Sequence, residues 1–109
     1  MRTAIIVGAL GLIVFSHGAD SDDQRTPQTH TVSIVDMRFQ PEMLTVATGD
    51  TVVWVNNDLV PHTATSEARG FDSKTIGADK SWSYTVRGKG NIAYLCTFHP
   101  TMKATLRVK

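Results

Sequence analysis

One short stretch of the chain gathers three side chains that bind soft metal ions. Cys96, the single cysteine, is followed by His99 and then by Met102, each three residues after the last. Thiolate, imidazole and thioether make up the ligand set of mononuclear copper sites that transfer electrons, in which the Met bond is weak. The stretch therefore predicts a copper site that one further imidazole would complete.

That imidazole is predicted to come from His62. It follows a loop, 56–61, that leaves an apolar run, and it lies 34 positions before Cys96. A single hairpin cannot bring the two residues together. In a Greek-key sandwich, however, strands remote in sequence become neighbours, so a loop and a strand end can converge at one pole. His30 lies at the edge of the domain and is not expected to be a ligand.

The elements that must position these side chains follow a β pattern. Apolar and polar residues alternate in short runs, turn residues separate the runs at intervals of about ten residues, and no window shows a helical period. Residues 51–55 are apolar on both faces and are expected to form a central strand. We expect an all-β Greek-key sandwich of two antiparallel sheets with about seven to eight strands. The alternating runs are 31–35, 44–46, 81–86, 92–96 and 104–108.

The N-terminus has the features of an export signal. A basic start, 1–3, precedes an apolar run, 4–15, and small residues follow at 16–18. A run of about 12 residues is short for a membrane-spanning helix. We expect a signal peptide over 1–18, a flexible leader over 19–29 and one copper-binding domain over 30–109. The protein would then be periplasmic or otherwise exported, with an uncleaved membrane anchor as the alternative.

Composition and ligand number narrow the function. The chain of 109 residues has a formal net charge of +1, and this overall balance implies neither nucleic acid nor an anionic membrane as a partner. Four protein ligands around one ion leave no open position for a substrate, so the site is not expected to be catalytic. Electron transfer remains, and no stable oligomer is expected.

Two longer motifs carry a family resemblance. The first runs from Phe39 to Thr63 and includes Gly49-Asp50-Thr51-Val52-x-Trp54-x-Asn56; the second is Tyr94-x-Cys96-Thr97-x-His99-Pro100-x-Met102. Together they resemble the cupredoxins, the type 1 blue copper proteins, over roughly residues 31–108. The short Cys-x-x-His-x-x-Met loop is similar to that of amicyanin, whereas plastocyanin has a longer loop.

The resemblance implies a ligand set and a function. It makes His62, Cys96 and His99 the equatorial ligands of one copper ion that alternates between Cu(I) and Cu(II), and Met102 the weak axial ligand. It implies a small soluble electron carrier outside the cytoplasm and not an enzyme. A copper-delivery protein of the same fold is the alternative.

The resemblance also implies supporting roles around the ligands. Asn56 matches an asparagine whose side chain joins the His-bearing loop to the Cys-bearing loop. Two residues depart from the amicyanin pattern, Thr63 in place of Asn and Phe98 in place of Pro. Because Phe has the backbone N–H that Pro lacks, we expect the Phe98 amide to donate toward the Cys96 sulfur and to raise the reduction potential.

By the same resemblance, electrons would leave through the edge of His99. The partner would be a redox protein, such as a cytochrome or a dehydrogenase, that docks transiently on an apolar collar formed by the two histidine-bearing loops. Arg69 and Lys103 are candidates for a basic rim around it. The collar residues are Leu59, Val60, Pro61, Phe98 and Pro100.

Each of these residues also has a plainer interpretation. A lone Cys is often an inert buried thiol, a loop His is often an ordinary surface residue, and Met often fills a core. Trp54 and Trp82 are expected to anchor the core and not to relay electrons. Zinc is disfavoured because it does not seek thioether ligands. A Cys-His hydrolase and a structural adhesion sandwich are the weakest alternatives.

Overall fold

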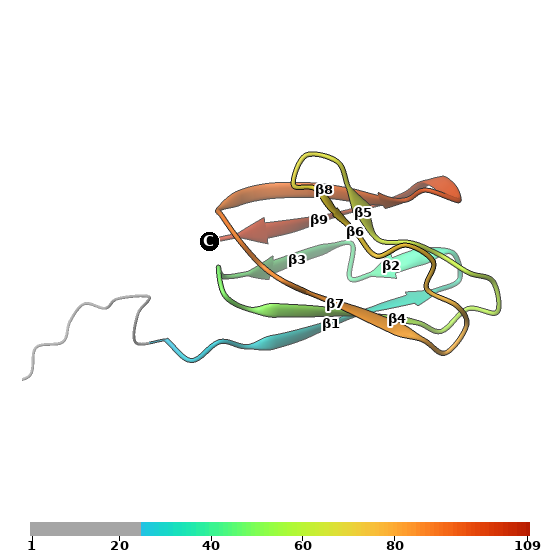
Figure 1. Cartoon of the computed structure of the whole chain (residues 1–109), viewed down its shortest axis with the longest axis horizontal. Helices are drawn as coiled ribbons and strands as arrows, with labels where there is room; N and C mark the ends of the chain where they lie inside the picture. Colours follow the sequence, from blue (N-terminus) through green and yellow to red (C-terminus); the bar gives the residue numbers. More distant parts are fainter. Residues whose placement is uncertain (1–24) are drawn as a thin grey trace, which may run out of the picture.

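The computed structural model describes residues 25–109, which form two stacked β-sheets (Figure 1). The first sheet has the strand order β2-β1-β4-β7, and the second has the order β3-β9-β8-β5-β6. Within residues 25–109 no helix has the length and hydropathy to cross a membrane. The strands are β1 (Thr29–Val35), β2 (Arg38–Gln40), β3 (Met43–Val46), β4 (Thr51–Asn56), β5 (Thr65–Ser66), β6 (Phe71–Asp72), β7 (Ser81–Thr85), β8 (Gly90–Cys96) and β9 (His99–Val108).

Strand β4 occupies the central position that its apolar sequence predicts. It lies between β1 and β7, and its alternate residues Val52, Trp54 and Asn56 are fully buried. The described residues contain nine strands, more than the expected seven to eight. Strands β5 and β6 have only two residues each, so no alternating run reveals them in the sequence.

The expectation of purely antiparallel sheets is wrong at two places. Strand β1 runs parallel to β4, with Val32 opposite Trp54, and β3 runs parallel to β9, with Leu44 opposite Leu106. Parallel neighbouring strands need a crossover connection. The connection from β1 to β4 includes β3 of the second sheet, and the connection from β3 to β9 includes β4 and β7 of the first sheet. Apolar alternation reports which residues face the core, but it carries no information about strand direction.

An aromatic cluster joins the two sheets and sets the position of the cysteine. Fully buried Trp54 lies 5.3 Å from the Tyr94 ring, 5.6 Å from Trp82 and 5.7 Å from Phe71, measured between ring centroids. Tilted and edge-on ring pairs each stabilise by about 1 kcal/mol beyond the burial of their area. Because Tyr94 and Cys96 alternate on the same buried face of β8, this packing also fixes the depth of the thiol.

The end of the sandwich where β1 begins is organised by a buried carboxylate. Asp50 pairs with Arg25 at 2.8 Å and with the His30 ring at 2.8 Å, and it accepts a hydrogen bond from the Gln28 amide. Burial raises the pKa of Asp50, but Arg25, the Gln28 and Ala47 amides and His30 together hold that pKa well below its usual range. Of the predicted N-terminal segments, the signal peptide and residues 19–24 lie outside the described residues.

Candidate metal centre

Two connections meet at the opposite end of the sandwich. The β8–β9 turn and the long connection from β4 to β5 lie side by side there (Figure 1). Cys96 ends β8, His99 begins β9, and the two residues are paired across the turn. His62 is held by a bridge to Ile76, with hydrogen bonds of 3.1 Å and 2.7 Å between their backbones. The sequence therefore folds both histidine-bearing segments onto one pole.

The first candidate pair is buried and in contact. The Nδ1 atom of His62 lies 3.7 Å from the Cys96 Sγ atom, and both side chains are fully buried. The His99 ring lies 5.3 Å from the His62 ring, centroid to centroid, and is half-buried. The predicted convergence of residues 62 and 96 is confirmed.

The other ring nitrogen of His62 is held by Asp58. The His62 Nε2 atom lies 2.8 Å from an Asp58 oxygen, and the Asp36 and Met37 amides donate to the same carboxylate. Burial raises the pKa of Asp58, but the Met37 amide, His62 and the Asp36 amide outweigh it and lower that pKa overall. An ionised Asp58 accepts a hydrogen bond from the Nε2–H group of His62, and in this tautomer the Nδ1 lone pair faces the sulfur. Sequence reasoning missed this role, and the only signal was an acid four residues before the histidine.

Thr63 joins the two loops. Its amide donates to Cys96 Sγ at 3.3 Å, and its hydroxyl oxygen accepts a hydrogen bond of 2.9 Å from the Thr97 amide. The Thr65 hydroxyl donates to the same oxygen at 3.0 Å, and the Thr97 hydroxyl lies 3.1 Å away. Thr63 is buried, so these contacts are shielded from water. One residue thus fixes the position of both neighbouring candidate ligands, His62 and Cys96.

Met102 lies on the inward face of β9. It is 5% exposed, between the exposed residues Thr101 and Lys103. Within residues 25–109 no three His, Cys, Asp or Glu side chains form a ready-made metal-binding group. Of the four predicted ligands, the structure places His62 and Cys96 in contact, the His99 ring beside them and Met102 in the core below the same hairpin.

The chain matches known proteins over most of its length. Residues 4–108 match the model of the cupredoxin-like domain. The chain belongs to the cupredoxin-like family. Amicyanin of Paracoccus versutus is 28% identical over 72% of this chain, and the match spans 63% of that amicyanin. Plastocyanin of Scenedesmus fuscus is 31% identical, over 65% of this chain and 86% of the plastocyanin.

Solved structures agree with this assignment. A variant of amicyanin in its Cu(I) form superimposes with a TM-score of 0.69 at 27% identity, covering 74% of this cupredoxin and 82% of the amicyanin. An oxidised amicyanin variant gives a TM-score of 0.70 at 29% identity, with the same coverage. The predicted all-β sandwich and the similarity to amicyanin are confirmed.

Two supporting roles expected of this cupredoxin are wrong. Asn56 does not bind the Cys-bearing loop, because its amide donates to the carbonyl oxygens of Val60 and Ile76, each at 2.9 Å. Thr63 joins the loops instead. The expected hydrogen bond from Phe98 to the sulfur is also missing from the described residues, in which the amide donor to Sγ is Thr63. Phe98 lies at the exposed tip of the β8–β9 turn, whereas Cys96 is buried.

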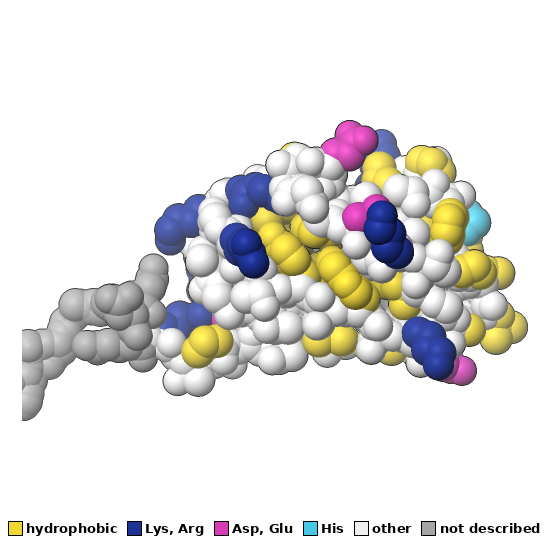
Figure 2. Space-filling model, in the orientation of Figure 1, with side chains coloured by type: hydrophobic (Ala, Val, Ile, Leu, Met, Phe, Trp, Pro, Cys, Tyr) yellow, Lys and Arg dark blue, Asp and Glu magenta, His cyan; other side chains and the backbone are white. Residues whose placement is uncertain are grey.

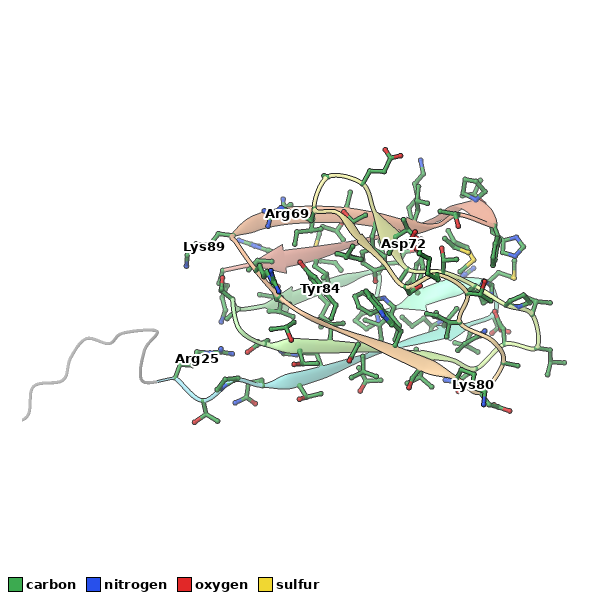
Figure 3. All side chains as sticks on the ribbon, viewed as in Figure 1. Arg25, Arg69, Asp72, Lys80, Tyr84 and Lys89 are labelled. Carbon is green, nitrogen blue, oxygen red and sulfur yellow. The ribbon has the colours of Figure 1, made fainter. Side chains whose placement is uncertain are left out.

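The apolar collar is exposed at this pole, as predicted. Leu59 is 94% exposed, and Val60 and Phe98 are about half exposed. Figure 2 shows hydrophobic side chains gathered beside a histidine at this end of the molecule. Arg69 is not part of a rim here, because it donates to the carbonyl oxygens of Arg87 and Lys89 at the far end (Figure 3).

Proposed function

We propose that this cupredoxin is a small blue copper electron carrier in which His62, Cys96, His99 and Met102 hold one copper ion. A thiolate, two imidazoles and a thioether are soft or borderline donors, a set that suits copper better than zinc or magnesium. Bound copper supplies a one-electron couple between Cu(II) and Cu(I). The observation that carries the proposal is the buried contact between His62 Nδ1 and Cys96 Sγ, 3.7 Å apart.

The residues of the chain hold the donors ready before metal arrives. Asp58 holds the His62 ring through Nε2, and the Thr63 amide donates a hydrogen bond to the Cys96 sulfur. Burial of His62 and Cys96 excludes water from both donor atoms. Little rearrangement is then needed when an electron enters or leaves, and this is the requirement for a fast carrier.

Burial also distinguishes a carrier from a copper-delivery protein. A delivery site must expose its ligands to the receiving protein, whereas His62 and Cys96 are fully buried and only His99 is half-buried. A set of four protein ligands leaves no open position for a substrate. Slow loss of Cu(I) to a chelator in excess is the expected result, and rapid transfer would support delivery instead.

We assign the docking surface to the apolar collar around His99. A small apolar patch favours a transient contact at the low end of interface sizes, which suits a redox protein that must dissociate after each electron. The apolar run at 4–15 supports a place of action outside the cytoplasm. The partner is then an exported or membrane-bound redox protein.

The ligand assignment is tested by adding Cu(II) to the apoprotein and recording visible and electron-paramagnetic spectra. An intense sulfur-to-copper charge-transfer band is expected, and Cys96→Ser should abolish it. Met102→Leu should change the potential or the spectrum, whereas the matched control Met43→Leu, at an exposed methionine, should change neither. A colourless copper complex, or an unchanged spectrum in Cys96→Ser, would refute the assignment.

The docking surface is tested by placing a charge in the collar. Val60→Asp should slow electron exchange with a redox partner and leave the visible spectrum intact, because Val60 is exposed beside the candidate ligands. Thr85→Asp, an exposed position at the end of β7 away from this pole, is the control and should exchange as fast as the parent. Equal rates in both variants would remove the collar from the mechanism.

A further inference from the structure

The end of the sandwich opposite the candidate metal centre carries a concentration of positive charge. Five segments meet there: 25–28, 47–50, 66–70, 86–91 and 107–109. Figure 2 shows Lys and Arg side chains clustered at this end, and Figure 3 places Arg25, Arg69 and Lys89 there. We call this end the basic pole. Its charged residues are Arg25, Arg69, Arg87, Lys89, Arg107 and Lys109, against Asp50 and Glu67.

In the rest of the described domain, acidic residues outnumber basic ones. Elsewhere in residues 25–109 four basic residues face five acidic ones, so the positive charge of the domain is confined to the basic pole. Of the two acids of the basic pole, Asp50 is fully buried and pairs with Arg25 and His30, and Glu67 is exposed. Arg69, Arg87 and Lys109 form no ion pair with any carboxylate of residues 25–109.

Hydrogen bonds hold these charges in place. The Arg69 guanidinium donates to the carbonyl oxygens of Arg87 and Lys89, which ties the β5–β6 loop to the β7–β8 loop. Lys89 Nζ in turn lies 3.3 Å from the Lys109 carbonyl oxygen, at the end of β9. The two acceptors of Arg69 are backbone carbonyl oxygens without net charge, so these bonds fix the guanidinium and leave its positive charge in place. A surface with these properties fits a planar array of anionic groups.

The chain itself enters the domain at this pole. Twenty-four residues precede Arg25, and they include the apolar run at 4–15. Residues 16–24 span at most about 30 Å when fully extended. A precursor whose apolar run lies in a membrane therefore holds the basic pole within that distance of the headgroups. The candidate metal centre and its collar lie at the other end and face away.

We propose that the basic pole is a docking surface for anionic phospholipid headgroups, which orients the exported protein with its metal centre directed away from the membrane. Basic residues near an anionic leaflet are each attracted to it, and the attraction falls off within a Debye length. The pole thus favours a weak, salt-sensitive association that leaves the collar open to a redox partner. This inference rests on the proposed place of action outside the cytoplasm but not on bound copper, so a failure of vesicle binding leaves the copper assignment standing.

The test measures vesicle binding of the exported protein, purified as cells process it and with its N-terminus established by mass spectrometry. Sedimentation is compared for vesicles of phosphatidylcholine alone and of phosphatidylcholine mixed equally with phosphatidylglycerol, at about 20 mM and about 500 mM salt. The readout is the fraction of protein bound to the anionic vesicles minus the fraction bound to the neutral vesicles. Subtracting the neutral vesicles removes any contribution from an apolar segment kept at the N-terminus.

Two matched double variants locate the binding surface. Arg87→Glu with Lys109→Glu reverses two exposed charges of the basic pole, and Arg38→Glu with Lys80→Glu makes the same change of net charge elsewhere on the domain. The pole variant should lose at least about tenfold in anionic binding, and the control should stay within about twofold. The far-ultraviolet circular dichroism spectrum and melting temperature of each variant confirm that it is folded.

Each other outcome overturns the proposal. If the protein does not bind anionic vesicles at low salt, the proposal is wrong. If both double variants lose binding equally, only the net charge matters and the basic pole is not the binding surface. Binding to polyglutamate without binding to vesicles would point to an acidic protein as the partner. Vesicle binding that appears only after Asp20, Asp22 and Asp23 are changed to Asn would mean that the acidic leader occupies the pole.

Discussion

Replacing Thr63 with Val removes the link between the two loops of the metal centre and changes little else. Val has nearly the same shape as Thr, and the backbone N–H that donates to Cys96 Sγ remains. The hydroxyl oxygen is lost, and with it the hydrogen bonds donated by the Thr97 amide at 2.9 Å and by the Thr65 hydroxyl at 3.0 Å. The variant therefore isolates the contribution of one side-chain oxygen.

The expected loss of stability follows from burial. A shielded N–H left without its acceptor costs about 1 to 3 kcal/mol, and Thr63 is 3% exposed. The Thr65 hydroxyl retains Asp72 as an acceptor at 3.1 Å, so its bond adds little to this cost. For a domain of this size, 1 kcal/mol shifts the melting temperature by about 4 to 8 °C, so a fall of about 4 to 24 °C is expected. Loss of the loop connection should also weaken Cu(II) binding about tenfold.

Thermal unfolding of the apoprotein and Cu(II) titration measure the two effects. Thr63→Ser keeps the oxygen and should restore most of the stability and the affinity. Thr97→Val removes a hydroxyl on the other loop but keeps the amide that donates to Thr63, so its melting temperature should fall by less than half as much. If Thr63→Val melts and binds copper like the parent, the loops are held by other contacts and the reasoning is wrong.

Three other substitutions test the structure outside that contact. Asp50→Asn should cost about 3 kcal/mol near neutral pH. Because the pKa of Asp50 is depressed by folding, its stabilisation is present above about pH 4 and disappears as the pH falls further, so acid titration of unfolding should show this loss in the parent and not in the variant. Gly88→Ala should cost about 1 to 3 kcal/mol in chemical denaturation, because Gly88 has a φ of 72° and the Arg69 guanidinium occupies the place of a Cβ atom. Asp58→Ala should lower Cu(II) affinity about tenfold by titration, since the His62 ring loses the acceptor that orients it, and an unchanged affinity would exclude that role.

Residue spacing was enough to predict the sandwich and the convergence of the two loops. The alternation of Ile92, Tyr94 and Cys96 puts all three on the buried face of β8, and the structure confirms this. The separation of His62 from Cys96 requires neighbours remote in sequence, and a Greek-key fold provides them. These predictions depend on burial alone, which the order of apolar and polar residues determines.

The supporting hydrogen bonds could not be predicted in the same way. Thr63, Asn56 and Asp58 are all polar residues at the end of β4 or in the loop after it, and their sequence positions do not say which partner each reaches. Their partners depend on how the backbone turns between β4 and β5, where few residues follow a regular period. Strand direction was missed for a related reason, because the face that a residue presents is the same in parallel and antiparallel pairs.

The place of β9 has a consequence for biosynthesis. This strand lies between β3 and β8, carries His99 and Met102, and is synthesised after the other eight described strands. Until it is made, β3 has no neighbour in its sheet and β8 lacks the partner with which it forms its longest ladder. Contacts between such distant segments close late and slowly. The sheet of β3, β9, β8, β5 and β6 can therefore close only after β9 is made, and the four candidate ligands cannot come together before then.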